Sequence, residues 1–202
     1  MELIVGTEST WSLRAWICLQ LVNVEVSEQV IDLTSENYKS IILKYSPTGL
    51  VPALIDVTCV IHDSLAITEY INESSNGGLY PENSGERALA RSLCSEMHSG
   101  FMNLRNQLPF TLKPITNTVE LSENIEAELS RVKAIFESAR IPYMFESAGA
   151  VDAFYSILAY RLKSYGITFE GKAGEYQQSL LSWSLLKNAI TQAKQWESIT
   201  AM

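Results

Sequence analysis

Cysteines are few in this 202-residue sequence and basic runs are absent, and each shortage removes a class of function. The three cysteines, Cys18, Cys59 and Cys94, lie far apart without metal or redox spacing, as is typical of a reducing cytoplasm. We therefore expect a cytoplasmic protein without a metal site. The 15 lysines and arginines are outnumbered by 23 aspartates and glutamates, giving a net charge of -8. This balance argues against a nucleic-acid partner, because phosphate binding needs concentrated lysine and arginine.

Long hydrophobic runs are also missing. No apolar stretch approaches the roughly 20 residues that a helix needs to span a bilayer. The start, Met1-Glu-Leu-Ile-Val-Gly6, has no positive flank and too short an apolar run for a signal peptide, so we expect no membrane partner. With 47% hydrophobic and 19% charged residues, the composition is that of a globular protein with room for two small domains.

The N-terminal third alternates between strand and helix patterns. The expected elements are a strand over 3–5, a helix with its apolar face at Leu13, Trp16, Ile17 and Leu21, a strand over 24–31, a hairpin over 53–61 and a helix over 65–71. This order predicts a thioredoxin-like α/β domain over residues 1–77.

A polar, glycine-rich segment over 72–78 predicts a linker, and the pattern beyond it is helical. Helical spacing covers 88–106, 121–136, 154–165 and 179–193, and strand signals are nearly absent. We therefore expect a second, all-helical domain over residues 86–202.

The segment Ser46-Pro-Thr-Gly-Leu-Val-Pro-Ala-Leu-Ile55 holds the first candidate site. Pro52 forces Val51 into an extended conformation, in which the Val51 N–H and C=O turn outward. A small peptide could pair with them as an added strand. The alternative is an ordinary loop proline before a strand.

The pair Asp63-Ser64 precedes a helical run and offers a second candidate. Either residue can cap that helix, which is the simpler explanation. The helix N-terminus also suits a carboxylate ligand, and the Asp63 carboxylate suits an ammonium group. The amino-acid end of a peptide carries both charges.

The order of turn, Val-Pro, hairpin, acidic residue, serine, Leu-Ala-Ile and Tyr-Ile resembles the glutathione transferase superfamily. Ser9-Thr-Trp-Ser-Leu-Arg14 is similar to the serine motif of zeta-class and related bacterial enzymes. Glu96-Met-His-Ser-Gly-Phe101 and Asp152-Ala-Phe-Tyr155 resemble helices of the second domain in a bacterial subgroup. The resemblance implies glutathione as co-substrate, a homodimer and a role in detoxification.

The resemblance also implies roles for individual residues. Ser9 would stabilise the glutathione thiolate, or Thr10 would donate instead. Glutathione would be held by Val51, Pro52, Asp63, Ser64 and Asn37. The second substrate would meet Trp11, His98, Phe101, Met102 and Arg105. Three of these residues also have a structural alternative. Ser9 could be only a helix cap, Asn37 a solvated loop residue and His98 a packing residue.

Thiol activation is the chemistry that such a site must perform. A free thiol has a pKa of about 8.5, so the thiolate is a minority at neutral pH. A hydroxyl donor and a helix N-terminus both favour the charged form, and lowering the pKa by about two units needs ~2.7 kcal/mol. Tyrosine is absent before Tyr38 and cysteine before Cys18, which disfavours tyrosine-type and omega-type enzymes.

Three hypotheses remain at this stage. The first is a transferase that conjugates the thiolate to small electrophiles. The second is a zeta-like cis-trans isomerase of the maleylacetoacetate isomerase type, against which counts the replacement of the motif's cysteine by Trp11. The third is a non-catalytic glutathione-binding or interaction protein.

Overall fold

Short β-branched and apolar runs form one four-stranded sheet. Its strands are β1 (Glu2–Gly6), β2 (Ser27–Ile31), β3 (Ala53–Ile55) and β4 (Val60–His62), in the order β2-β1-β3-β4. β1 pairs with β2 in parallel and with β3 antiparallel, and β3 and β4 form an antiparallel hairpin. This mixed sheet is the α/β half of the expected fold.

The computed structural model describes residues 1–116 and 119–200 and divides into two units. The first unit holds residues 1–79 together with the chain from Asn188 onward, and the second holds Tyr80–Lys187. The expected domain bounds, 1–77 and 86–202, stay a prediction; the packing groups the end of the chain with the sheet.

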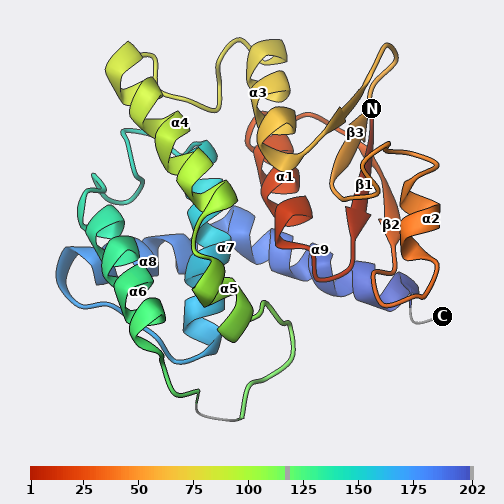
Figure 1. The fold of residues 1–202 in the computed structure, drawn as a ribbon. Coiled ribbons are helices and arrows are strands. Elements are labelled where there is room, and N and C mark those ends of the chain that lie inside the picture. The colour runs from red at the N-terminus through yellow and green to blue at the C-terminus, as the bar shows by residue number, and fades with distance from the viewer. Residues whose placement is uncertain (117–118, 201–202) are drawn as a thin grey trace. The chain divides into compact units, whose positions relative to one another are not determined.

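Helices cover both faces of the sheet in the first unit. They are α1 (Thr10–Leu21), α2 (Tyr38–Ile42), α3 (Ser64–Ser74) and the part of α9 (Ser184–Thr200) that follows Lys187. α1 and α3 lie together on one face, and α2 lies beside β2 on the other (Figure 1). On the α2 side, Ile4, Ile31, Ile42 and Ala53 form a buried cluster.

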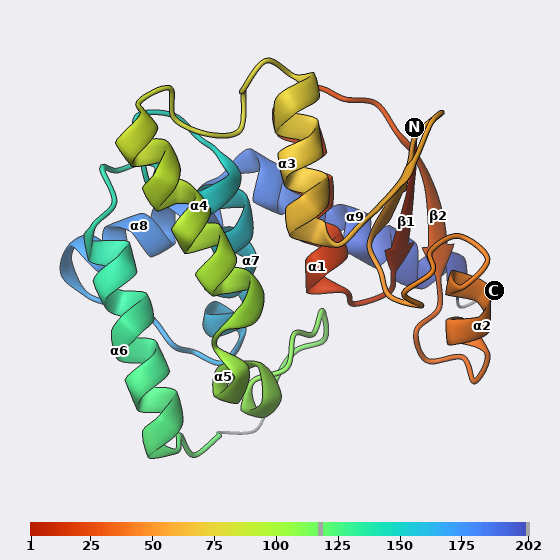
Figure 2. The same ribbon diagram turned by 45° about the horizontal axis from the view of Figure 1, so that its top comes forward.

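All the regular elements in the described residues of the second unit are helices. They are α4 (Ser84–Ser99), α5 (Met102–Gln107), α6 (Glu123–Glu137), α7 (Ala150–Ser164), α8 (Gly171–Ser182) and the start of α9. α4 and α8 both pack against α7, and α6 packs against α8 (Figure 2). None of the helices in the described ranges has the length and hydropathy that a membrane crossing requires.

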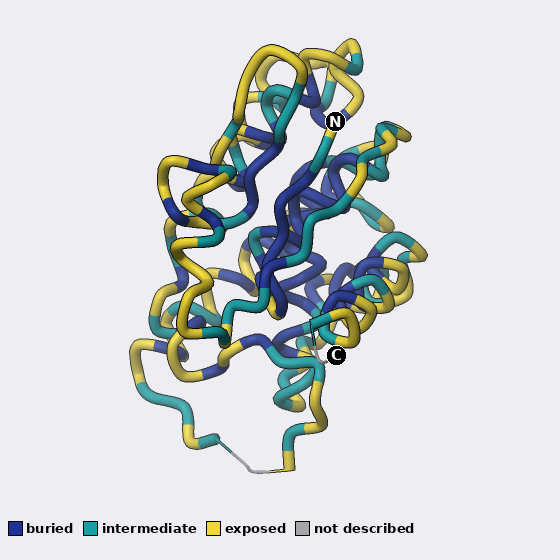
Figure 3. Tube along the Cα trace, turned by 90° about the vertical axis from the view of Figure 1, so that its right-hand side faces the viewer, coloured by how far each residue is buried: buried dark blue, intermediate teal, exposed yellow. Residues whose placement is uncertain are grey.

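Burial follows the expected apolar patterns closely. β1 is buried from Leu3 onward (Figure 3), and almost every residue of α7 is buried. The Asp152 carboxylate anchors the start of α7, because it accepts hydrogen bonds from the Gly149 and Met144 amides at 2.9 Å and from the Tyr176 hydroxyl at 2.7 Å. Burial raises the pKa of Asp152, although these donors oppose the shift.

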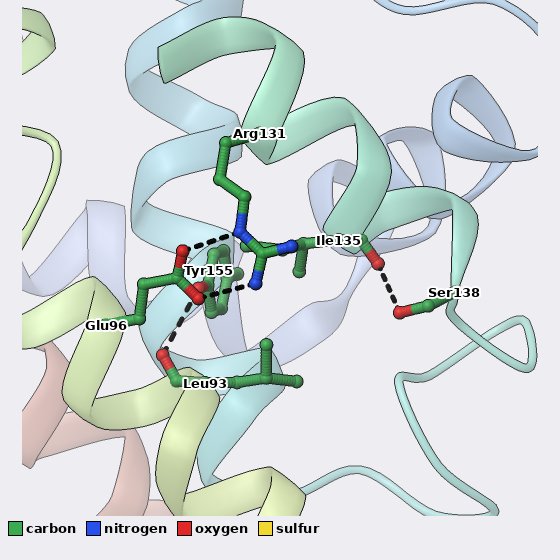
Figure 4. Close-up of polar contacts among 6 residues, drawn as sticks. All are labelled: Leu93, Glu96, Arg131, Ile135, Ser138 and Tyr155. Carbon is green, nitrogen blue, oxygen red and sulfur yellow. Dashed lines mark hydrogen bonds and ion pairs between the residues drawn. The ribbon is translucent and has the colours of Figure 1, made fainter. Parts of the chain in front are cut away.

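Polar contacts tie α4 to its neighbours (Figure 4). The Arg131 guanidinium of α6 donates to both carboxylate oxygens of Glu96 in α4, at 2.7 and 2.8 Å. The Tyr155 hydroxyl of α7 donates to the Leu93 carbonyl at 3.2 Å. These contacts fix the orientation of α4, whose C-terminal end carries several candidate residues.

Two expected helices differ from the structure, and one observed helix was not expected. The expected helix over 88–106 is two helices, because the chain breaks at Gly100 and Phe101, where Phe101 has a φ of 57°. A side chain at position 100 would meet the Glu96 carbonyl at 2.7 Å, so the break needs glycine. The expected helix over 179–193 is also two helices, separated at Trp183, and α2 was not expected at all.

Candidate functional site

The two halves of the predicted peptide site meet at one end of the sheet. Ile4 pairs with Ala53, and Ala53 pairs with His62, so the ends of β1 and β4 lie beside the beginning of β3. The register therefore brings Val51-Pro52 next to Asp63-Ser64. The hairpin explains why two motifs ten residues apart in sequence can serve one ligand.

Gly6, at the end of β1, belongs to the same edge. A β-carbon there would lie 2.6 Å from Leu33 Cδ1 and 2.9 Å from Val51 Cγ2, so a larger residue would have to displace these two side chains. Gly6 was not among the predicted site residues. Its signal was present, since a glycine that ends a strand often marks a close backbone contact.

The loop from Gly6 to Ser12 holds the predicted catalytic serine. The Ser12 hydroxyl accepts from the Gly6 amide, and the Ser9 amide donates to the Gly6 carbonyl, both at 3.2 Å. Ser9 is the N-cap of α1, and its Oγ accepts from the Ser12 amide at 3.2 Å. The expected capping role is therefore real. It leaves the hydroxyl proton of Ser9 available for donation, because a hydroxyl has one donor and two lone pairs.

Thr10 is the first residue of α1 and only 3% exposed. Its Oγ1 is buried and, among the described residues, makes no hydrogen bond. The positive end of the α1 dipole lies at these two residues, which favours a nearby anion. Next to them, Trp11 is half-buried, with the Arg14 guanidinium 5.6 Å from its ring centre.

Val51 has the backbone that strand addition requires. The Val51–Pro52 peptide bond is cis, and no hydrogen bond in the described residues uses the Val51 N–H or C=O. The preceding turn is closed by the Thr48 hydroxyl, which accepts from the Leu50 amide at 3.2 Å. Gly49 in that turn has a φ of 66°, a conformation that glycine adopts without strain.

Asp63 caps α3, as the simpler alternative expected. Its Oδ1 accepts from the Leu65 and Ala66 amides at 2.9 and 3.1 Å. Ser64 begins α3 and is fully buried, with its carbonyl accepting from the Thr68 hydroxyl at 2.8 Å. This end of α3 is a helix N-terminus beside Val51-Pro52.

Asn37 stands apart from this group. It is exposed at the beginning of α2, and its carbonyl accepts from the Ile41 amide and the Ser40 hydroxyl. Its side chain makes no capping hydrogen bond. The described contacts do not join Asn37 to the other predicted glutathione ligands, so its role stays a prediction.

Cys18 is a buried packing residue of α1. The Thr68 hydroxyl donates to its sulfur at 3.6 Å, which links α3 to α1. Burial raises the pKa of Cys18 to about 12, and the Thr68 hydrogen bond only partly opposes the shift. Cys18 is therefore a neutral thiol, unsuited to nucleophilic chemistry.

In the helical unit, the predicted substrate residues gather at the junction of α4 and α5. His98 lies in the last turn of α4, Phe101 is nearly buried and Met102 is 52% exposed. Arg105 donates to the Met97 and His98 carbonyls, so it closes the C-terminal end of α4. In the described residues, no group of three or more histidine, cysteine, aspartate or glutamate side chains could hold a metal ion.

Comparison with known proteins gives these motifs a family. The family model for the N-terminal domain of glutathione S-transferases matches residues 8–74. The probable maleylacetoacetate isomerase of Caenorhabditis elegans is 36% identical over 99 residues, which are 48% of this chain. The match covers 46% of that protein, so this chain spans about half the length of the curated relatives that it matches.

Solved structures agree in fold over nearly the whole chain. A glutathione transferase homolog from Burkholderia, solved with bound glutathione, has a TM-score of 0.71 at 22% identity and covers 96% of this chain and 97% of its own. A bacterial zeta-class maleyl pyruvate isomerase has a TM-score of 0.74 at 18% identity, with coverages of 96% and 98%. Residues 8–74 therefore form a glutathione S-transferase N-terminal domain, in a chain whose thioredoxin-like and helical units have the fold of glutathione transferases.

Proposed function

We propose that this protein is a glutathione S-transferase that conjugates the glutathione thiolate to small electrophiles, with Ser9 as the donor that stabilises the sulfur. One observation carries the proposal: Ser9, the N-terminus of α1, Val51 and the N-terminus of α3 meet at one end of the sheet. Those groups supply a hydroxyl donor, an unpaired strand edge and an anion-binding helix end.

The proposed binding mode uses the backbone more than side chains. The central residue of glutathione would pair with the Val51 N–H and C=O, which Pro52 keeps extended. Its amino-acid end would meet the N-terminus of α3 at Ser64, and the Asp63 carboxylate would attract the ammonium group. Asn37 would add a further polar contact.

Thiolate stabilisation would come from two sources. The Ser9 hydroxyl would donate to the sulfur while its oxygen still caps α1. The N-terminus of α1 would add a favourable dipole. One charge-assisted hydrogen bond and a helix end together account for about two pKa units.

Conjugation kinetics with chlorodinitrobenzene test this assignment. We expect Ser9→Ala to lower kcat/KM by about tenfold or more, since a hydrogen bond to a charged group contributes about 1.5–3 kcal/mol. Thr10→Val, which removes the neighbouring hydroxyl at constant shape, should retain most of the activity. Conjugation that survives both substitutions would remove the catalytic role from this loop.

A zeta-like isomerase is the second candidate, favoured by the match to the probable maleylacetoacetate isomerase. In this reaction the thiolate adds reversibly to a cis double bond of a dicarboxylic acid. The reaction therefore turns over without net consumption of glutathione, and a glutathione balance separates it from conjugation. Tight glutathione binding without turnover of any electrophile would instead favour a non-catalytic binding or interaction protein.

The resemblance also bears on the location, the oligomeric state and the second substrate of the protein. By resemblance to glutathione transferases, it would be a cytoplasmic homodimer that detoxifies electrophiles. Its second substrate would meet Trp11, His98, Phe101, Met102 and Arg105. Sedimentation equilibrium tests the homodimer, with a mass near twice the 22.5 kDa of one chain as the expected result.

A further inference from the structure

Glu8 is an exposed carboxylate directly before the proposed catalytic serine. The Ser9 amide donates to the Gly6 carbonyl at 3.2 Å, so Thr7 and Glu8 are the central residues of a tight turn that ends at Ser9. The Glu8 side chain is exposed, and its carboxylate makes no hydrogen bond or ion pair in the described residues. Its charge therefore acts on the solvent and on whatever binds beside Ser9.

The backbone at Glu8 has a conformation that glutamate rarely adopts. Its φ is 55°, in the left-handed region, and this position of a tight turn normally holds glycine or asparagine. Asn23 and Asn76, with φ values of 55° and 56°, follow that rule elsewhere in the chain. Local conformational preference therefore does not explain the glutamate, and such departures are concentrated at functional sites.

The side chains around this turn leave its exposed charge negative. The first 21 residues hold only three charged side chains, those of Glu2, Glu8 and Arg14. Glu2 begins β1, at the strand end away from Ser9, and Arg14 is only 1% exposed. Asp63 adds a second exposed carboxylate at the same end of the sheet.

The charge of Glu8 reaches the reacting sulfur in any side-chain conformation. Consecutive Cα atoms lie about 3.8 Å apart, so the carboxylate stays within about 11 Å of Ser9 Oγ in every rotamer. This distance is comparable with the Debye length of about 8–10 Å at ordinary salt concentrations. An electrophile that approaches a thiolate held by Ser9 therefore enters the field of Glu8.

We propose that Glu8 selects the second substrate by charge, so that the electrophile is a neutral or positively charged molecule and not a dicarboxylic acid. The electrophile part of this inference rests on the proposed transferase function. The Glu8 carboxylate attracts a cation and repels an anion that comes close to Ser9. A dicarboxylic acid would bring two negative charges to this position, which counts against the zeta-like isomerase.

Stabilisation of α1 is the alternative role for Glu8. Ser9 is the N-cap of α1, so Glu8 lies directly before the helix, where a negative charge is favourable. In that role, removal of the charge would lower the stability of the protein and leave the preference among electrophiles unchanged. The charge of the electrophile therefore separates the two roles.

Three electrophiles that differ only in the charge of a remote tail test the proposal. They are the N-aminoethyl, N-propyl and N-carboxymethyl amides of chloronitrobenzoic acid, which are cationic, neutral and anionic. In each reaction the thiolate sulfur forms a bond to the ring carbon and chloride leaves with its electron pair. The rate with free glutathione corrects for differences in intrinsic reactivity.

At low ionic strength, we expect the corrected kcat/KM to be about fivefold higher for the cationic amide than for the anionic amide. Two unit charges about 10 Å apart in water interact enough to change a rate about twofold, and the step from anion to cation counts this effect twice. Equal values, or a higher value for the anionic amide, would overturn the proposal.

Substitutions assign the preference to Glu8. Glu8→Gln should lower the ratio of cationic to anionic kcat/KM about fivefold, whereas Glu8→Asp should keep it. Glu25→Gln removes an exposed carboxylate beyond the other end of α1 and should leave the ratio unchanged. If Glu8→Gln fails to fold, Glu8→Asn removes the same charge and adopts a positive φ more readily.

Salt provides a second check on the same variants. Near 1 M salt the Debye length falls to about 3 Å, so the unmodified protein and Glu8→Gln should give the same ratio. A ratio that stays unchanged at low salt in a folded Glu8 variant without the charge contradicts the proposal, whatever the effect of that variant on stability.

Binding without turnover separates this inference from the transferase function. The glutathione conjugates of the three amides, prepared chemically, can be titrated against the full chain in a calorimeter. If no amide is conjugated, but the cationic conjugate binds more tightly than the anionic one and Glu8→Gln removes the difference, the charge selection stands and the transferase function falls. If all three amides are conjugated with a ratio that Glu8→Gln does not change, the transferase stands and this inference falls. If none of the conjugates binds, both fall.

Discussion

The Ser9 hydroxyl serves two partners at the scale of a single residue. Its oxygen accepts from the Ser12 amide to cap α1, and its proton is the proposed donor to the glutathione sulfur. Thr10 differs, because its buried Oγ1 caps nothing and has no partner among the described residues. Stability and activity should therefore respond differently to substitutions at these neighbouring positions.

Unfolding in urea measures the capping role. We expect Ser9→Ala to lower the free energy of unfolding by about 1 kcal/mol, the usual cost of a lost N-cap. Thr10→Val removes a buried hydroxyl that lacks a partner, so the free energy of unfolding should stay the same or rise. A larger loss from Thr10→Val than from Ser9→Ala would contradict the described geometry.

Thiol reactivity checks the burial of the cysteines. Cys59 is exposed, whereas Cys18 and Cys94 are buried, so a thiol reagent should modify only Cys59 in the folded protein. Because the pKa of Cys18 is raised to about 12, its neutral form favours the fold. That contribution is complete below the ordinary thiol pKa of about 8.5 and is lost as the pH rises toward 12. Rapid labelling of Cys18 at neutral pH in native protein would contradict this placement.

At the scale of elements, Glu28 of β2 links α1 to the C-terminal part of α9 within the first unit. Its Oε1 accepts from the Trp16 indole at 2.6 Å, and its Oε2 accepts from the Trp196 indole at 2.6 Å and the Gln192 amide at 2.9 Å. Both tryptophans are buried. One carboxylate thereby connects α1, β2 and α9.

Replacing this carboxylate by an amide should loosen α9. In Glu28→Gln the side-chain N–H₂ would face an indole or amide donor, and an unsatisfied buried donor costs about 1–3 kcal/mol. We expect lower stability and faster amide exchange over 188–200, with Glu25→Gln, at an exposed position of the same segment, as the control. Equal exchange in the two variants would show that Glu28 does not hold α9.

At the scale of the whole molecule, local patterns predicted more of the fold than of its polar contacts. The thioredoxin-like order and the helical second half follow from apolar spacing and turn residues that lie close together in sequence. The break at Phe101 was missed because Gly100 lies within a strong helical pattern. Glu28 was also missed, since its partners Gln192 and Trp196 lie 164 and 168 residues away.

The candidate site shows the same division. Val51-Pro52 and Asp63-Ser64 were predictable, because proline and helix-capping residues act on their own neighbours. Gly6 had only the general signal of a glycine that ends a strand, and its contact with Val51 becomes visible only in the folded sheet.

The pKa of glutathione bound to the protein tests the central claim most directly. The ultraviolet absorbance of the thiolate, titrated against pH, should give a pKa about two units below the ~8.5 of a free thiol. In Ser9→Ala the pKa should return most of the way to the free value, while in Thr10→Val it should stay low. A bound thiol that titrates like free glutathione in the unmodified protein, or a pKa that Ser9→Ala leaves unchanged, would contradict the account.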